Sequence, residues 1–249
     1  MFVTTPSNEI EDAIDFMHQV AATPDAVRER QGASDDDIQR FIELAQHPLP
    51  YLYIGYLRQF GTNAGPLSLA PDTNLKRLIN HYIDRSIHAR PVRDGVLLSA
   101  VSAVEGPYML RYSEAAKRGT EEPTVVISGD VDRMLATNFR CALYQNIIYS
   151  RPLDLPLLMR LERFPKEDTF DREREANMAE VARAAQDLGF QGYWFNDACV
   201  GWFERDDGSV LYVDTLDFSV FARGHFNTPD ARDWVQEYLT ECVGLLPAK

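Results

Sequence analysis

The stretch from Leu49 to Gly65, LPYLYIGYLRQFGTNAG, constrains the fold of this chain more than any other. Pro50 suits the first turn of a helix, where the N–H group that proline lacks would have no partner. Four residues then recur at the i, i+3, i+4 and i+7 spacing of one helix face: Tyr53, Tyr56, Leu57 and Phe60. Gly61, Asn63 and Gly65 end the pattern because they tolerate positive φ. The stretch predicts an amphipathic helix docked on a core and followed by a tight turn.

Shorter patterns flank this stretch in a definite order. Upstream, Ser34 and the acidic run 35–37 precede the apolar positions Ile38, Phe41, Ile42 and Ala45, which predicts a helix. Downstream lie three apolar runs, 96–101, 108–112 and 124–127. Leu135, Phe139 and Leu143 follow at every fourth position.

This order of motifs resembles that of the SUKH superfamily, whose pattern LPxxYxxFLxxxNGG is similar to the stretch 49–65. The resemblance covers roughly residues 33–150. It implies a central strand pair at 96–101 and 108–112, a next strand at 124–127 and a closing helix that contains Leu135, Phe139 and Leu143. The chain departs from the family at two points, because it has Ala64 in place of the first glycine of Asn-Gly-Gly, and Gly61 and Thr62 separate the helix from the turn. The family includes fungal cell-wall-assembly regulators and bacterial immunity proteins that neutralise toxins. The resemblance implies an α+β fold in which helices pack on a central, mostly antiparallel sheet.

A second, smaller α/β domain is predicted over residues 156–249, after a first domain of residues 1–155 that begins with a helix over 9–21. Three prolines interrupt any helix near the boundary: Pro152, Pro156 and Pro165. The second domain reads as a helix, an antiparallel meander and a helix. Its predicted elements are a helix over 171–188 and strands over 192–196, 200–205, 209–215 and 218–222. Thr228 and Pro229 begin the last helix, whose predicted inner face holds Ala231, Trp234, Val235, Tyr238, Leu239 and Cys242.

Composition excludes several classes of protein. The formal net charge is −13, and residues 160–249 contribute −8 of it, from 18 acidic and 10 basic residues. Direct nucleic-acid binding needs clustered Lys and Arg, so we expect no nucleic-acid partner. The sequence has no apolar run long enough to span a membrane and no secretory signal, which predicts a cytoplasmic protein without a membrane partner. Wide spacing of Cys141, Cys199 and Cys242 within apolar patterns predicts reduced core thiols.

The sequence shows no recognisable motif of a nucleophile–base pair, a zinc protease or a phosphate loop. His81 and His88 could in principle hold a metal with Asp84, but solvated positions on a helix surface are the favoured interpretation. The meander contains several carboxylates at predicted strand ends or exposed faces, where carboxylates are usually solvated: Asp197, Glu204, Asp214 and Asp217. We therefore expect no enzymatic activity, no metal and no cofactor.

The resemblance and the acidic charge together predict an immunity protein that binds a cognate antibacterial toxin in the cytoplasm and occludes its active site. The resemblance implies that such a toxin is often a basic nuclease, and an acidic surface speeds its capture. The expected contact residues lie in the acidic meander: Asp197, Asp206, Asp207, Asp214 and Asp217. The same residues also suit turns and solvation without any partner.

Two other functions stay open. An intracellular regulatory or scaffolding protein of the cell-wall-assembly type is the alternative, and an enzyme whose site has no recognisable motif is the third. The sequence carries no signal for an oligomeric state.

Overall fold

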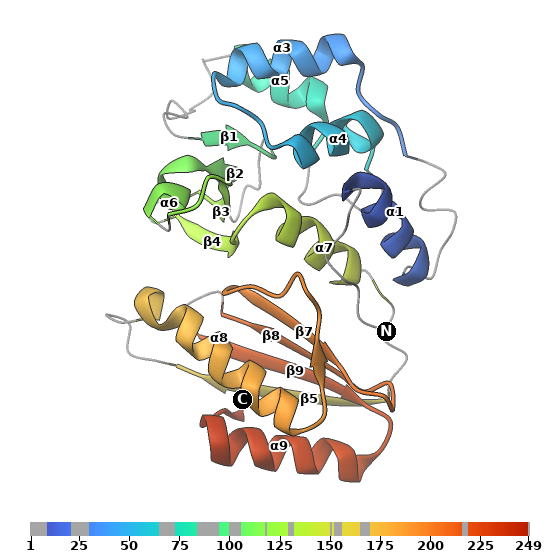
Figure 1. The fold of residues 1–249 in the computed structure, drawn as a ribbon, viewed down its shortest axis with the longest axis vertical. Helices are drawn as coiled ribbons and strands as arrows, with labels where there is room; N and C mark the ends of the chain where they lie inside the picture. The colour runs from blue at the N-terminus through green and yellow to red at the C-terminus, as the bar shows by residue number, and fades with distance from the viewer. Residues whose placement is uncertain are drawn as a thin grey trace. The chain divides into compact units, whose positions relative to one another are not determined.

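A computed structural model describes residues 9–20, 30–64, 73–83, 95–99, 106–117, 119–128, 132–149, 151, 156–164, 170–215 and 219–248. These residues form two compact units, an N-terminal unit of 9–151 and a C-terminal unit of 156–248. Each unit contains helices and one antiparallel sheet, so the predicted α+β class is confirmed (Figure 1).

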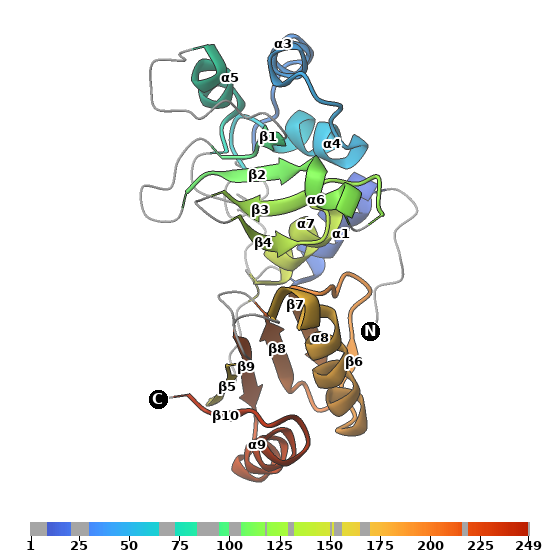
Figure 2. The ribbon, with the colours of Figure 1, turned by 90° about the vertical axis from the view of Figure 1, so that its left-hand side faces the viewer.

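The N-terminal unit combines a four-stranded sheet in the order β1-β2-β3-β4 with helices that precede and follow its strands. Its helices are α1 (Glu9–Val20), α3 (Asp35–Ala45), α4 (Tyr51–Phe60), α5 (Leu75–Ile83), α6 (Tyr112–Lys117) and α7 (Phe139–Tyr149). Its strands are β1 (Gly95–Leu97), β2 (Tyr108–Arg111), β3 (Thr124–Ile127) and β4 (Arg133–Ala136). Helices α1, α4 and α7 pack against one another, and α7 also contacts β3 and β4 (Figure 2).

Helix α4 is the helix predicted from the stretch 49–65. Pro50 is its N-cap residue, and the N–H of Gly61 closes it by donating to the Leu57 carbonyl at 2.8 Å. The predicted aromatic face is buried, and the ring of Tyr53 lies 4.9 Å from that of Phe139 on α7. The aromatic stripe therefore joins α4 to the closing helix of the unit. Gly65, the last residue of the predicted turn, lies outside the described residues.

The closing helix begins later than the sequence pattern indicates. The resemblance implies one helix that contains Leu135, Phe139 and Leu143, but Leu135 belongs to strand β4, which pairs with β3. Asn138 separates the two elements because its Oδ1 accepts a hydrogen bond from the N–H of Cys141 at 2.8 Å. This side chain caps the first turn of α7 and sets its start at Phe139.

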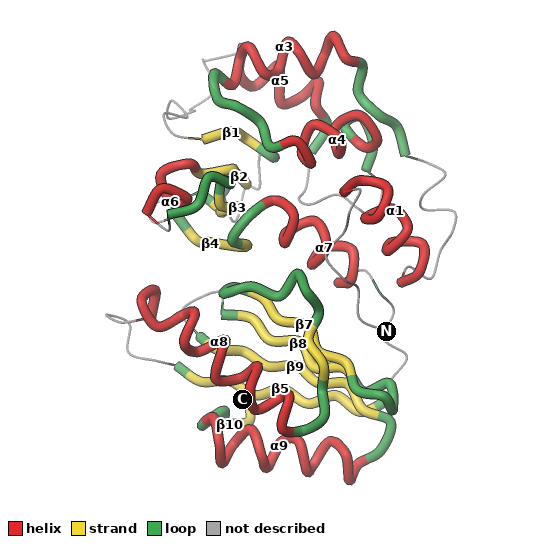
Figure 3. Tube along the Cα trace, viewed as in Figure 1, coloured by secondary structure: helices red, strands yellow, loops and turns green. Residues whose placement is uncertain are grey.

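The C-terminal unit is a six-stranded antiparallel sheet with two helices (Figure 3). Its elements are β5 (Leu157–Arg163), α8 (Phe170–Asp187), β6 (Gln191–Gly192), β7 (Val200–Glu204), β8 (Val210–Asp214), β9 (Val220–Phe226), α9 (Pro229–Val243) and β10 (Leu246–Pro247). The strand order is β10-β5-β9-β8-β7-β6, so the predicted meander forms one side of the sheet. Both helices share a single hydrophobic core with one face of the sheet.

Three strands differ from the sequence prediction, and one of them is β9, which extends to Phe226 where the predicted strand ends at residue 222. Strand β5 occupies the proline-flanked boundary segment and pairs along its whole length with β9, burying Met159 and Leu161. The predicted strand 192–196 is short because Asn196 turns back on β7. Its side chain donates to the Trp202 carbonyl and accepts from the Trp202 N–H, both at 2.8 Å. The Tyr193 N–H still donates to the Trp202 carbonyl at 3.1 Å, so the amide oxygen replaces only the backbone acceptor that the Trp202 N–H would have in a longer strand.

Helix α9 begins as predicted, with the Thr228 hydroxyl accepting a hydrogen bond from the N–H of Ala231 at 3.3 Å. Val235 and Leu239 are buried as predicted. Trp234 and Cys242 are exposed, so the prediction that they belong to the inner face is wrong. A helix packed on a sheet buries a narrow stripe, and these two residues lie at its edges. The expectation of core thiols therefore holds for the buried Cys141 and Cys199 only; all three cysteines are free.

Candidate partner-binding surface

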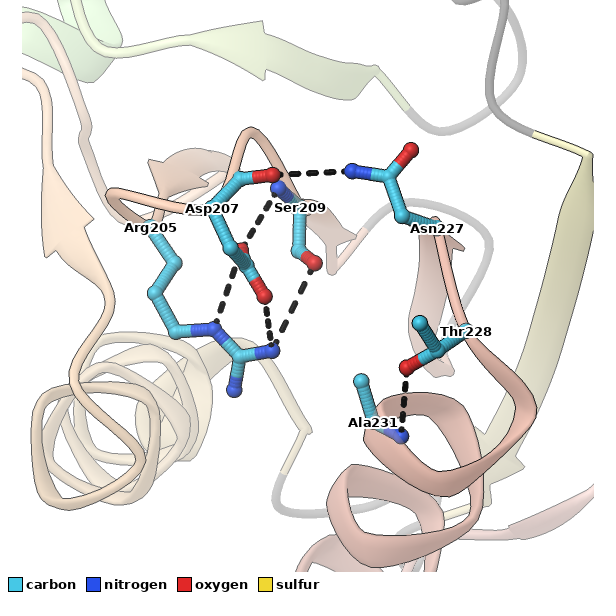
Figure 4. Close-up of polar contacts among 6 residues, drawn as sticks. All are labelled: Arg205, Asp207, Ser209, Asn227, Thr228 and Ala231. Carbon is cyan, nitrogen blue, oxygen red and sulfur yellow. Dashed lines mark hydrogen bonds and ion pairs between the residues drawn. The ribbon is translucent and has the colours of Figure 1, made fainter.

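A tight turn joins β7 to β8 and is held by the side chain of Asp207. Its Oδ1 accepts a hydrogen bond from the N–H of Ser209 at 2.9 Å and another from Nε of Arg205 at 3.1 Å. A second guanidinium nitrogen donates to Oδ2 at 2.6 Å, so the ion pair is bidentate (Figure 4). Gly208 has a φ of 80°, which a residue with a side chain would adopt only with strain. The turn is therefore fixed by its own residues.

The carboxyl group of Asp207 keeps its negative charge over a wide pH range. Hydrogen bonds from the Arg205 side chain are the main reason that its pKa falls from 3.8 to about 2, and the Ser209 N–H lowers it further, while partial burial acts in the opposite direction. The side chain is still 46% exposed. Asp207 thus combines a structural role with a charge that faces solvent.

The guanidinium group of Arg205 connects this turn to helix α9. It lies 5.1 Å from the ring centroid of Phe190 and 5.6 Å from that of Trp234. Phe190 is buried, whereas Trp234 is 49% exposed. Cation–π contacts at exposed sites contribute about 0.5–1 kcal/mol. Arg205 therefore holds a surface tryptophan next to the turn without burying it.

The turn is also tied to the N-terminus of α9 by hydrogen bonds. The side-chain nitrogen of Asn227 donates to the Asp207 carbonyl at 2.8 Å, and the next residue, Thr228, caps the helix (Figure 4). Turn and helix are thus joined both by these polar contacts and by the ring of Trp234. We expect the two elements to present a single, preorganised surface.

The outer face of α9 extends the acidic turn. Asp230, Asp233 and Glu237 are exposed, and their spacing places them around Trp234 on one side of the helix. We define the acidic Trp234 surface as Asp206, Asp207, Asp230, Asp233, Trp234 and Glu237. Arg232 pairs with Asp233 at 2.6 Å, as Arg205 pairs with Asp207. Five carboxylates against two guanidinium groups leave a formal charge of −3 around a half-exposed aromatic ring.

The other predicted contact residues do not join this surface. Asp197 begins a turn, since its Oδ1 accepts hydrogen bonds from the N–H groups of Cys199 at 2.8 Å and Val200 at 3.0 Å. Asp214 ends β8 opposite Val200, at the far end of the β7–β8 pair from Asp206 and Asp207. Both side chains are half-buried. Asp217 lies outside the described residues. The predicted contact residues thus lie at opposite ends of the β7–β8 pair, with Asp206 and Asp207 at one end and Asp197 and Asp214 at the other.

The contribution of α9 was missed because its sequence was interpreted through its apolar positions. The acidic residues Asp230, Asp233 and Glu237 recur at i, i+3 and i+7, which is a helix-face pattern in its own right. That pattern could have placed them together with Trp234. Their proximity to the β7–β8 turn depends on the contact between Arg205 and Trp234 and had no signal in the sequence.

Among the described residues, no three His, Cys, Asp or Glu side chains gather in the way that metal ligands do. His81 lies in α5, while Asp84 and His88 are outside the described ranges, so that candidate set is not described as a whole. The Glu204 carboxylate accepts a hydrogen bond from the Tyr193 hydroxyl at 2.7 Å. No helix in the described part of the chain is long and apolar enough to cross a bilayer.

Comparison with known proteins gives no relative from which a function could be transferred. No protein-family model, curated protein or solved structure matches the chain. Functional inference therefore depends on the residues and their arrangement.

Proposed function

We propose that this chain is a non-enzymatic immunity protein that binds a basic protein toxin and blocks its activity. The observation that carries the proposal is the acidic Trp234 surface, where a 49% exposed tryptophan lies among five exposed carboxylates. Tryptophan is enriched among residues that dominate binding energy, and the charges around it select a partner of opposite sign. A basic protein surface satisfies both features.

The construction of the surface supports binding rather than a purely structural role. Asp207 and Thr228 stabilise the turn and the helix start, but Asp206, Asp230 and Glu237 form no ion pair with another described residue. A solvated helix face would need no aromatic residue at its centre. Large exposed apolar side chains with a polar surround are typical of protein interfaces.

The immunity function also draws on the resemblance of residues 33–150 to the SUKH motifs, and the helices expected from the first two motifs are present in the N-terminal unit. The Ser34 hydroxyl accepts a hydrogen bond from the N–H of Asp37 at 3.2 Å and caps α3. Helix α4 then follows with Pro50 at its start and its aromatic face in the core.

The proposal is tested by capturing partners of the full chain from its native host, identifying them by mass spectrometry and purifying a candidate toxin. One equivalent of the chain should then abolish the toxin's activity. Trp234→Ala should weaken binding by about 2 kcal/mol or more, which is about thirtyfold. Phe164→Ala removes another aromatic ring of the same unit, 72% exposed, and should leave the affinity unchanged.

Two results would overturn the proposal. If a captured partner keeps its activity when saturated with the chain, the chain is not its inhibitor, and a scaffolding role becomes the better explanation. If Trp234→Ala and Phe164→Ala bind the toxin equally well, the partner uses another surface.

A further inference from the structure

The ring of Trp234 already holds one guanidinium group of the chain itself. The guanidinium carbon of Arg205 lies 5.6 Å from the ring centroid. Two nitrogens of the same group donate to the carboxylate of Asp207 at 3.1 and 2.6 Å (Figure 4). A cation–π contact is thus combined with a bidentate ion pair. Trp234 is nevertheless 49% exposed, so part of the ring is accessible to a partner.

Two further carboxylates flank this ring along α9. Asp230 lies four residues before Trp234 and Glu237 three residues after it. Each is therefore a neighbour of Trp234 on the helix surface, with Cβ atoms about 5–6 Å apart. Both residues are exposed, and neither side chain forms an ion pair or a hydrogen bond with another described residue. The ring and the two carboxylates offer the same combination of groups that binds Arg205, but without an occupant from the described part of the chain.

The charges around the ring leave the surface negative when its cations are included. Of the five carboxylates, Asp207 and Asp233 each pair with a guanidinium group at 2.6 Å, that of Arg205 and that of Arg232. The N-terminus of α9 adds a partial charge of about +0.5, an effect confined to the first turn. Five negative charges, two positive charges and this dipole sum to about −2.5. The surface therefore favours a cationic side chain.

We infer that the acidic Trp234 surface receives an arginine side chain of the basic partner, stacked on the accessible part of the ring and paired with Asp230 or Glu237. A guanidinium group is planar, stacks on aromatic rings and donates two parallel hydrogen bonds to a carboxylate. A lysine ammonium is a compact, strongly hydrated charge and fits this combination less well. The inference rests on the proposed function and deepens it by naming the partner residue that contacts Trp234, but its test requires no partner.

The test uses the full chain at about 0.1 M salt with N-acetyl-arginine amide as the probe. N-acetyl-lysine amide has the same charge without the planar group, and N-acetyl-citrulline amide has a similar shape without the charge. The indole N–H signal of Trp234 in a ¹H–¹⁵N spectrum, assigned by its loss in Trp234→Leu, should shift with saturation. We expect a dissociation constant on the order of 1–10 mM for a single side chain. Both other compounds should bind at least severalfold more weakly, and the signal of the buried Trp202 should not move.

Two variants test the groups assigned to the site. Asp230→Asn/Glu237→Gln should bind the arginine probe about two- to thirtyfold more weakly, the range expected for two exposed ion pairs. Trp234→Leu, followed through the backbone signals of α9, should bind it about two- to fivefold more weakly, as expected for one exposed cation–π contact. Because all three positions are exposed, the variants should fold, which the same spectra verify.

A matched control removes the same charge from another part of the C-terminal unit. Glu173→Gln/Glu175→Gln changes two exposed carboxylates near the start of α8 and should bind the probe like the wild type. Helix α8 reaches α9 at its other end, where the Tyr238 hydroxyl donates to Asp187 at 3.1 Å. Glu173 lies about 21 Å from Asp187 along the helix axis, roughly twice the Debye length at 0.1 M salt.

Four results would overturn the inference: no saturable shift of the Trp234 signal, equal binding of the lysine or citrulline compound, unchanged arginine affinity in the Asp230/Glu237 variant, or an equal loss in the Glu173/Glu175 control. None of them decides whether the chain inhibits a toxin, which the capture and inhibition assay measures separately. Conversely, saturable arginine binding by a chain that leaves its captured partner active would refute the proposed function alone.

Discussion

Truncation of Phe60 measures how strongly helix α4 is anchored in the N-terminal unit. The side chain is 3% exposed, and its ring centroid lies 5.2 Å from that of Tyr56. A buried aromatic side chain removes about 150–250 Å² from water, worth about 4–6 kcal/mol at ~25 cal/mol per Å². The methyl group left in Phe60→Ala retains about 0.8 kcal/mol of this. We therefore expect a loss of about 3–5 kcal/mol in the free energy of unfolding.

Urea unfolding of the full chain, followed by far-UV circular dichroism, reports on both units, and the transition that tryptophan fluorescence does not follow gives this value for the N-terminal unit. All three tryptophans lie in the other unit, at positions 194, 202 and 234, so their fluorescence follows that unit separately. Tyr51→Ala is the control, because the same helix exposes 88% of this ring, and it should change stability by about 0.5 kcal/mol or less. Equal midpoints for Phe60→Ala and Tyr51→Ala would show that the assigned helix face is wrong.

Two further predictions concern the acidic turn and α9. Because the folded pKa of Asp207, about 2, lies below its usual 3.8, its stabilising effect is complete above pH 3.8 and is lost as the pH falls through about 2. Solvent screens this exposed ion pair, so Asp207→Asn should lower the free energy of unfolding by about 0.5–1 kcal/mol at pH 7 and by almost nothing near pH 2, as measured by denaturant unfolding. An equal loss of stability at both pH values would contradict this. Changing Asp206 and Asp230 to Asn and Glu237 to Gln together should slow toxin association severalfold in stopped-flow measurements at low salt, with no difference at about 1 M salt. Equally fast association at low salt would exclude this surface from steering.

Local signals were sufficient to predict the elements whose ends are set by their own residues. Pro50 begins α4 and Thr228 caps α9, and both positions follow from the chemistry of unpaired N–H groups at helix starts. The turn at Asp207-Gly208 is likewise local, because an aspartate side chain and a glycine with positive φ are enough to form it. Such features involve residues a few positions apart, which a sequence pattern records.

Features that depend on residues distant in sequence were not predictable. Strand β5 is stabilised by pairing with β9, about sixty residues later, and its flanking prolines concealed its alternating pattern. Trp234 looked like a core residue because its helical position borders the buried stripe. Its place beside the β7–β8 turn depends on Arg205, which belongs to another element. Of the acidic Trp234 surface, the sequence therefore predicted only the two residues of the β7–β8 turn, Asp206 and Asp207.

The distribution of ion pairs over the acidic Trp234 surface separates its two contributions to binding. Asp207 and Asp233 each lie within 2.6 Å of a guanidinium group, so at distances beyond about 10 Å each pair acts as a nearly neutral unit. Long-range attraction then comes from Asp206, Asp230 and Glu237, which form no ion pair with a described residue. Trp234 acts only at contact. Loss of the three carboxylates should therefore lower the association rate, whereas loss of the ring should raise the dissociation rate. If the carboxylate variant changes only the association rate and the ring variant only the dissociation rate, the carboxylates attract the partner at long range and Trp234 holds it at contact. If both variants change both rates together, this division of roles is wrong.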